Sequence, residues 1–373
     1  MGSKLLIASA GAGKTTFLIK ETKKINSRIL ITTYTRSNEE EIKKAIIYEY
    51  GCIPSHIELL TWYEFLLRHG VRPFQGSMDD FLYEKSIGFL FKNEQSTKGI
   101  EEKDTLRYYF NTTLKIYSDK ISQFIINCNV KINGSIISRI ESIYSHIFVD
   151  EIQDMVGYDL DILHLLIKSN IELLLVGDPR QTTYFTHPTT KYKKYQDGKI
   201  ENYFKEIVNK KKEICKIDKD TLNQSHRNNQ VICNLSSKLY PSLPRAEECI
   251  CDKCRNYDEN GHIGIFLLFE KDISNYLEKY EPIQLRWNVK TKGDPKFPIH
   301  NFGDAKGKSF DRVLIYPTKD MKLWIINNEH ILEDQTRAKF YVAITRARKS
   351  SAIVVDDNIC LDNIGDECCI YKP

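Results

Sequence analysis

The start of the chain places a short apolar stretch, a glycine-rich turn and a helical pattern in immediate succession. Residues 5–8 have the composition of a buried strand, residues 8–16 form the turn, and a helical pattern begins at Phe17. A strand that passes through such a turn into a helix presents backbone N–H groups and the positive end of the helix dipole to an anion. This feature predicts an α/β domain with a phosphate-binding site at the end of a strand.

The turn contains the residue types that phosphate binding requires. The candidates are Ala10, Gly11, Ala12, Gly13, Lys14, Thr15 and Thr16. Lys14 can place its charge on the β- and γ-phosphates of a nucleotide, and the Thr15 hydroxyl can ligate Mg²⁺. Ala8 occupies the place of the first glycine in the general pattern. The alternative interpretation is a glycine-rich turn with a surface lysine.

A second apolar segment, residues 147–149, runs directly into Asp150 and Glu151. Parallel sheets deliver acidic side chains to a nucleotide site at the carboxyl ends of their strands. We expect Asp150 to hold Mg²⁺ and Glu151 to orient and deprotonate the attacking water. An acidic helix cap is the alternative. A further apolar segment, 171–176, leads to Gln181, whose amide could contact the γ-phosphate or that water.

Length and composition limit the class of protein. The chain has 373 residues, 41% hydrophobic content and a net charge of +4, which suit a globular protein of two or three domains. The charge is too small to identify a nucleic-acid binder, so local patches must supply any such contact. No apolar run approaches the roughly 20 residues that span a bilayer, so we expect no membrane insertion and a cytoplasmic location.

Six further motifs accompany the phosphate turn and the acidic strand, two of them between these features and four after both. Residues 32–42 and 61–65 each combine a strand end with aromatic residues, and residues 177–184 include Gly177, Asp178 and Gln181. The second half adds residues 222–227, 303–311 and 341–347. The order and content of these motifs resemble the UvrD/Rep-like branch of superfamily 1 DNA helicases, over nearly the whole chain.

The resemblance implies two RecA-like α/β domains with parallel sheets and a nucleotide held in the cleft between them. The first would span residues 1–205 with a small, mainly helical insertion at about 71–140. The second would span residues 206–373 with a short, cysteine-containing insertion at about 241–300. Both insertions are smaller than is usual for the family.

The resemblance also implies roles for particular residues. Arg346 would be an arginine finger, Arg227 a second γ-phosphate contact, and Gly307 and His226 part of the nucleotide site. His226 stands where the family places a base-stacking tyrosine, and no glutamine motif that reads adenine precedes the phosphate turn. The residues implied to contact DNA are Tyr34, Thr35, Arg36, Trp62, Tyr184 and Phe185.

Two other clusters have alternative interpretations. Residues 191–195 alternate lysine with tyrosine, which suits either a single nucleic-acid strand or a solvated loop. Cys249, Cys251 and Cys254, with His262 beyond them, provide enough ligands for tetrahedral Zn²⁺, although the spacing is not the paired form and a thiol-rich loop without metal is the alternative.

The resemblance implies an ATP- and Mg²⁺-dependent translocase that moves on single-stranded DNA, or DNA with a single-stranded tail, and unwinds duplex in the 3′ to 5′ direction. The alternative is a nucleic-acid-sensing regulatory ATPase within a repair or phage-defence complex. Only about 25 residues follow the last motif, too few for a nuclease domain, so any nuclease would be a separate partner.

Overall fold

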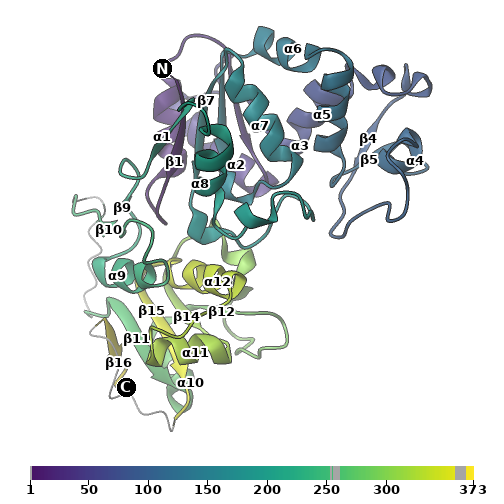
Figure 1. Ribbon diagram of the computed structural model, residues 1–373. Coiled ribbons are helices and arrows are strands. Elements are labelled where there is room, and N and C mark those ends of the chain that lie inside the picture. The colour runs from purple at the N-terminus through teal and green to yellow at the C-terminus, as the bar shows by residue number, and fades with distance from the viewer. Residues whose placement is uncertain (1, 253, 255–260, 358–366) are drawn as a thin grey trace. The chain divides into compact units, whose positions relative to one another are not determined.

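The chain folds into two compact units, which are described separately (Figure 1). The computed structural model describes residues 2–252, 254, 261–357 and 367–373. The first unit comprises Met1–Leu6, Lys14–Gly177 and Tyr184–Asp218. The second unit comprises Ile7–Gly13, Asp178–Thr183 and Lys219–Pro373. The phosphate turn and the segment around Gln181 therefore pack with the second unit, although strands of the first unit lead into them.

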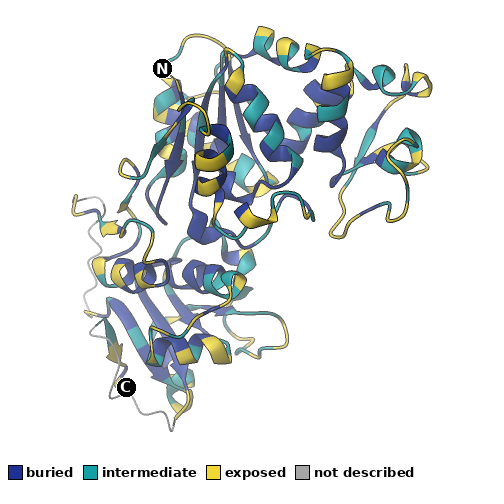
Figure 2. Cartoon of the chain, in the orientation of Figure 1, coloured by how far each residue is buried: buried dark blue, intermediate teal, exposed yellow. Residues whose placement is uncertain are grey.

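The first unit is built on a six-stranded sheet with the strand order β3-β2-β6-β7-β1-β8. The strands are β1 (Ser3–Ile7), β2 (Ile29–Thr33), β3 (Ile57–Thr61), β6 (His146–Asp150), β7 (Glu172–Gly177) and β8 (Cys215–Asp218). β2 pairs in parallel with both β3 and β6, and β6 pairs in parallel with β7. The apolar residues of β2, Ile29, Leu30 and Ile31, are fully buried, as expected for an inner strand of a parallel sheet. The strands of this unit are largely dark blue in Figure 2.

Helices follow most strands of the first unit. They are α1 (Lys14–Thr22), α2 (Arg36–Tyr50), α3 (Trp62–Phe65), α4 (Thr105–Tyr109), α5 (Ile121–Lys131), α6 (Ser135–Ile143), α7 (Tyr158–Lys168) and α8 (Ile200–Tyr203). Thr35 caps α2 by accepting a hydrogen bond from the Asn38 N–H, and Thr61 with Glu64 forms a capping box on α3. The predicted insertion at 71–140 contains α4, α5 and a small ladder of β4 (Gly88–Leu90) and β5 (Lys115–Tyr117).

The second unit has its own six-stranded sheet, in the order β13-β12-β14-β15-β11-β16. Its strands are β11 (Gly264–Phe269), β12 (Ile283–Arg286), β13 (Ile299–Asn301), β14 (Phe310–Ile315), β15 (Ala347–Val355) and β16 (Cys368–Ile370). Its helices are α9 (Gln230–Lys238), α10 (Ile273–Tyr280), α11 (Lys319–Ile326) and α12 (Asp334–Ile344). All strand pairs in this sheet are parallel.

A two-stranded parallel ladder lies beside α9 in the second unit. β9 (Gln224–Ser225) pairs with β10 (Glu247–Glu248), and Asn229 caps α9 through a hydrogen bond from the Ile232 N–H. The ladder matters for function because β9 ends immediately before His226 and Arg227.

Two parallel sheets with helices confirm the predicted α/β class. β8 lies beyond residue 205 and pairs with β1 of the first sheet, while the segment 241–300 supplies β11, β12 and β13 to the second sheet. None of the helices in the described ranges is long and apolar enough to cross a membrane.

Candidate nucleotide and nucleic-acid site

The phosphate turn depends on two glycines with left-handed backbone. Gly11 and Gly13 both have φ of +74°, a conformation that costs a residue with a side chain about 1–2 kcal/mol. Space is also limited at Gly11, where a Cβ atom would lie 2.6 Å from the Ser225 hydroxyl oxygen and 2.7 Å from Cβ of Arg227. The turn can therefore adopt this shape only with glycine at position 11.

Within the second unit, the turn is held by hydrogen bonds from residues of distant motifs. The Ala10 N–H donates to the Tyr341 hydroxyl at 3.2 Å, and the Ser225 hydroxyl donates to the Ala10 carbonyl at 2.8 Å. The His226 N–H donates to the Gly11 carbonyl at 2.9 Å. Tyr341 and Ser225 lie inside motifs visible in the sequence, but nothing in their type alone indicated that they hold the turn.

The carboxylates of the first unit lie where β6 ends. Asp150 is its last residue and is 4% exposed, and its carboxylate accepts a hydrogen bond from the Glu151 N–H at 3.0 Å. Glu151 has a left-handed φ of +58°, which is uncommon for a residue with a side chain and is typical of strained functional positions. Lys14 Nζ lies 3.6 Å from Glu151 Oε1, so the structure brings these two predicted residues together.

The remaining predicted residues of the phosphate turn lie at the start of α1. Lys14 is the first residue of this helix, Thr15 is half-buried and Thr16 is exposed. The Gln153 side chain donates a hydrogen bond to the second carboxylate oxygen of Glu151, a contact that the sequence did not indicate. The amide therefore fixes Glu151 on the side away from Lys14.

In the second unit, Arg346 contacts Gln181 directly. Arg346 is 1% exposed, and its Nη2 donates to Gln181 Oε1 at 3.1 Å. The Gln181 amide nitrogen in turn donates to Asp178 Oδ2 at 2.8 Å. The predicted arginine finger and the predicted phosphate sensor thus form one hydrogen-bonded chain, although 165 positions separate them in the sequence.

Arg180 is a site residue that the sequence analysis missed. Its guanidinium is buried, lies 3.2 Å from the Asp178 carboxylate and donates to the Ala8 carbonyl at 3.1 Å. Burial opposes the charge of Arg180, but Tyr341 and Asp178 hold its pKa above the ordinary value. Arg180 connects the segment around Gln181 to the beginning of the phosphate turn.

Arg227 and Gly307 lie on loops of the second unit. Arg227 Nη1 donates to the Thr345 carbonyl at 3.4 Å, and the neighbouring Asn228 amide donates to the same carbonyl at 3.1 Å. These bonds place Arg227 beside the segment that carries Arg346. Gly307 has a φ of +85° in the loop before β14, so this position also favours glycine.

A cavity of about 500 Å³ in the first unit is lined by two of the residues predicted to contact DNA, Tyr34 and Arg36. It is lined by Tyr34, Arg36, Thr61, Tyr63, Glu64, Leu67, Arg68, Arg72 and Phe89. Tyr184 lies beside it, with its ring centroid 5.8 Å from that of Tyr34. Arginine side chains and aromatic rings around one hollow suit the phosphates and bases of a single strand.

The other predicted DNA contacts are placed differently. Thr35 caps α2, and Phe185 is half-buried close to Tyr184 in the chain. Trp62 is completely buried and packs on Phe65, with ring centroids 5.5 Å apart, so in this structure it offers no face to a base. Trp62 is therefore a core residue at the start of α3.

The lysine and tyrosine segment at 191–195 packs onto its own unit. The Tyr192 hydroxyl donates to the Asp161 carboxylate at 2.8 Å, and the Lys191 ammonium lies 3.3 Å from the same carboxylate. Tyr195 is buried against Tyr203. These contacts favour the structural alternative for this segment over a stacking platform.

The cysteine cluster is assembled differently from the prediction. Ligand atoms of Cys249 and Cys254 lie close to the imidazole of His226, whereas His262 is buried elsewhere. The His262 ring stacks on Phe266 with centroids 3.7 Å apart. The sequence selected His262 because it follows the cysteines, but it precedes β11 and packs with the aromatic residues around α10.

Comparison with known proteins gives one match by sequence. Residues 90–206 match the sequence model of the UvrD/REP helicase N-terminal domain. No curated protein matches the chain.

Solved structures of viral helicases resemble the chain at low identity. The arterivirus nonstructural protein 10 helicase aligns with 95% of this chain and 59% of its own, at 13% identity and a TM-score of 0.45. The same helicase in complex with DNA aligns with 97% and 63%, at 13% identity and a TM-score of 0.45. The PRRSV helicase aligns with 98% and 54%, at 15% identity and a TM-score of 0.44. The chain thus spans less than two thirds of each of these proteins.

The domain match covers the acidic strand and the Gln181 segment, and the other motifs lie on either side of it in the order of the same family. Residues 90–206 are therefore the part of the chain that is similar to the UvrD/REP helicase N-terminal domain.

Proposed function

We propose that this protein hydrolyses ATP to move along single-stranded DNA and unwinds duplex in the 3′ to 5′ direction. The observation that carries the proposal is the pair formed by Lys14 and Glu151, 3.6 Å apart, next to the buried Asp150 at the end of β6. A phosphate-binding lysine, a carboxylate base and a metal-binding carboxylate are the groups that phosphoryl transfer to water requires.

The donor atoms in the first unit fit Mg²⁺. Thr15 and Asp150 offer a hydroxyl and a carboxylate oxygen, which are the hard ligands that this ion prefers. A bound Mg²⁺ would neutralise charge on the phosphates. Lys14 would contribute a further positive charge, and Glu151 would accept the proton of the attacking water, held in place by its bond from Gln153.

The second unit contributes the other charges. Arg346 and Arg227 are proposed to stabilise the negative charge that develops on the γ-phosphoryl oxygens, an effect worth about 10³- to 10⁵-fold in rate for an arginine finger. Gln181 is hydrogen-bonded to Arg346, so a change at the γ-phosphate would reach both residues together.

The proposed DNA contact is the cavity lined by Tyr34, Tyr63, Phe89 and three arginines. The Arg36 side chain is more accessible than that of Arg68, 81% exposed against 55%, even though Arg36 pairs with Glu64. A single strand could place phosphates on the arginines and stack bases on the rings.

The deciding experiment measures ATP hydrolysis without nucleic acid and with single-stranded DNA, duplex DNA or RNA, at two salt concentrations. We expect single-stranded DNA to stimulate the rate, and Glu151→Gln to abolish hydrolysis while ATP binding persists. Glu278→Gln, at an exposed position on α10, is the matched control and should behave like the wild type. A rate that is indifferent to nucleic acid would contradict the proposal.

A strand-displacement assay on tailed duplexes separates the motor from the regulatory alternative. Unwinding of a 3′-tailed duplex by the chain alone supports a helicase. DNA-stimulated hydrolysis without strand separation, with or without an added nuclease or repair partner, would instead favour a nucleic-acid-sensing ATPase.

A further inference from the structure

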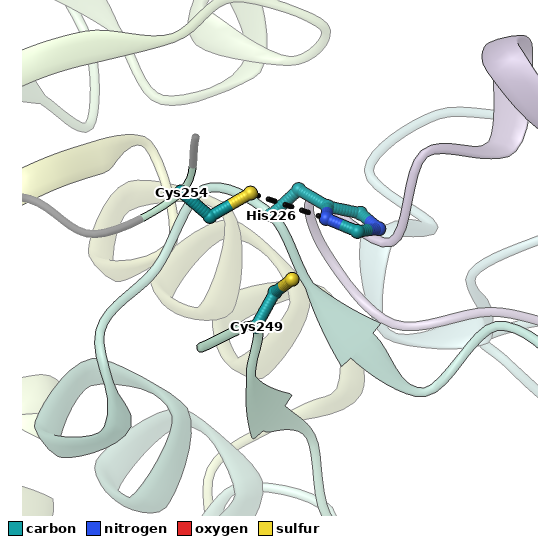
Figure 3. Close-up of side chains that lie close together, drawn as sticks. All are labelled: His226, Cys249 and Cys254. Atoms are coloured by element: carbon teal, nitrogen blue, oxygen red, sulfur yellow. Dashed lines mark hydrogen bonds between the residues drawn. The ribbon is translucent and has the colours of Figure 1, made fainter. Parts of the chain in front are cut away.

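One cluster of metal-ligand side chains lies outside the proposed nucleotide chemistry. His226, Cys249 and Cys254 each offer a ligand atom, and these atoms all lie within 4.8 Å of one another. His226 Nδ1 is 3.3 Å from Cys254 Sγ, and Figure 3 shows both sulfur atoms close to the imidazole. The three residues belong to the second unit, but they come from separate segments of the chain.

The parallel ladder of β9 and β10 explains why these side chains meet. Ser225 is paired with Glu248, so the next residue on each strand is His226 and Cys249, respectively. The ladder continues with a hydrogen bond from the Cys249 N–H to the Ser225 carbonyl at 2.9 Å. His226 and Cys249 therefore emerge together from the ends of two hydrogen-bonded strands.

A tight turn brings the remaining thiols to the same place. The Cys254 N–H donates to the Cys251 carbonyl at 2.9 Å, which folds the chain back toward β10. The Cys254 thiol interacts with the thiols of both Cys251 and Cys249. Cys249 and Cys254 lie within 4.8 Å of each other and of His226, whereas Cys251 interacts with Cys254 without being within 4.8 Å of all three.

We propose that His226 Nδ1 and the thiolates of Cys249, Cys251 and Cys254 bind a structural Zn²⁺ ion. Three sulfur ligands and one imidazole form a closed set, which is typical of structural zinc and leaves no position for substrate. Binding forms three Zn–S bonds and one Zn–N bond, and the three thiol protons pass to solvent.

The distances need only a small adjustment. Zn–S bonds of about 2.3 Å and Zn–N bonds of about 2.0 Å place tetrahedral ligand atoms roughly 3.6–3.8 Å apart. The separation of 3.3 Å between His226 and Cys254 is already close to this value, and the largest separation among His226, Cys249 and Cys254, 4.8 Å, must shorten by about 1 Å. The Cys251 thiol must also move in beside Cys254 to complete the set. His226 is exposed and Cys254 is half-buried, so these two side chains can make such a shift by rotation while the buried Cys249 stays in place.

The ion would fix the segment that contacts the phosphate turn. The His226 N–H donates to the Gly11 carbonyl, and the ring Cδ2 lies 3.5 Å from the position of a Cβ on Gly13. With Nδ1 bound to metal, Nε2 carries the remaining proton and faces the turn. Arg227 is the next residue in the chain, so zinc would also fix the backbone of Arg227. This consequence for hydrolysis rests on the proposed function, whereas metal binding does not.

The first test measures the metal content of the full chain expressed with zinc and purified under reducing conditions without chelator. We expect about one zinc per chain, falling below about 0.2 in Cys251→Ser, Cys254→Ser and His226→Ala. The controls are Cys52→Ser and Cys369→Ser, which alter exposed thiols outside the cluster and should retain the metal. His262→Gln should also retain it, in contrast to the set suggested by sequence alone.

The second test does not depend on whether a variant folds. Cobalt titrated into the reduced, metal-free wild type should give the absorption of a tetrahedral thiolate complex, and zinc should displace it. Chelation of the zinc form should lower its melting temperature. Folded wild-type protein with substoichiometric zinc and no cobalt spectrum, or with these cysteines joined in a disulfide, would overturn the proposal. Zinc binding without any ATPase activity would refute the proposed function and leave the metal site standing.

Discussion

Replacing Arg346 tests the proposed chemistry most directly, because this side chain is both buried and fully engaged. Its guanidinium donates to Gln181 Oε1 at 3.1 Å, to the Val342 carbonyl at 3.1 Å and to the Lys308 carbonyl at 3.2 Å. An alanine at this position would remove the charge and leave three acceptors without this donor. The substitution therefore affects catalysis and stability by separable amounts.

The catalytic loss follows from the charge. An arginine finger contributes at least about 10³-fold in rate, which corresponds to about 4 kcal/mol of transition-state stabilisation. The structural loss follows from the three acceptors, which together contribute about 2–5 kcal/mol to the free energy of unfolding. Arg346→Lys keeps the charge and can reach only part of this network. We expect it to lower kcat by about 10²-fold or more with a smaller loss of stability.

The assay measures kcat at saturating ATP and single-stranded DNA for Arg346→Ala and Arg346→Lys, together with urea unfolding and binding of a fluorescent ATP analogue. Arg245→Ala, at an exposed position on the same unit, is the control and should match the wild type. A folded Arg346→Lys enzyme with kcat within about threefold of the wild type would refute the role of this residue in the reaction.

Three further predictions concern the phosphate turn, the DNA cavity and pH. Gly11→Ala should weaken ATP binding by about tenfold or more, because it adds strain and a Cβ only 2.6 Å from a hydroxyl oxygen. Gly51→Ala is the control, because Gly51 has a φ of +76° but no atom within 4 Å of the added Cβ. It should cost only about 1 kcal/mol of stability and leave ATP binding intact. If both variants weakened ATP binding equally, the steric argument would be wrong. Arg36→Ala should reduce, by about 0.7, the steepness with which the logarithm of the single-strand binding constant falls against the logarithm of the salt concentration. Arg107→Ala, outside the cavity, should leave this slope unchanged. An unchanged slope for Arg36→Ala would exclude a phosphate contact there. Burial lowers the pKa of His69 from 6.5 to about 4. Between these two pH values His69 is protonated in the unfolded chain but neutral in the folded protein. The melting temperature should therefore fall as the pH drops from 6.5 toward 4. His69→Gln should reduce this change of melting temperature with pH. If the variant shows the same change, other groups cause it.

The sequence by itself determined the features that depend on neighbouring residues. The apolar segment before Ala8, the glycines at 11 and 13 and the helix that begins at Lys14 lie within one short stretch. The same holds for β6, which ends at Asp150 and is followed directly by Glu151. Strand, turn and helix propensities act over a few residues, so their patterns predicted the phosphate turn, the acidic strand and the α/β class.

Contacts between distant segments could not be predicted in this way. Nothing local shows that Tyr341 accepts a hydrogen bond from Ala10, that Arg346 meets Gln181, or that Arg180 reaches the Ala8 carbonyl. These pairs depend on how strands are ordered in a parallel sheet, where neighbours in space are connected through long crossovers. The sequence supplied the motifs, and the fold decided which motifs touch.

The same reason explains the residues that the sequence placed wrongly or left open. Trp62 lies at a strand end in sequence, but the capping box turns α3 so that its indole enters the core. His262 follows the cysteines in the chain, yet His226 is the histidine that the register of β9 and β10 brings to Cys249. Residue type and spacing determined that this protein has candidate zinc ligands, and only the tertiary structure decided which histidine belongs to them.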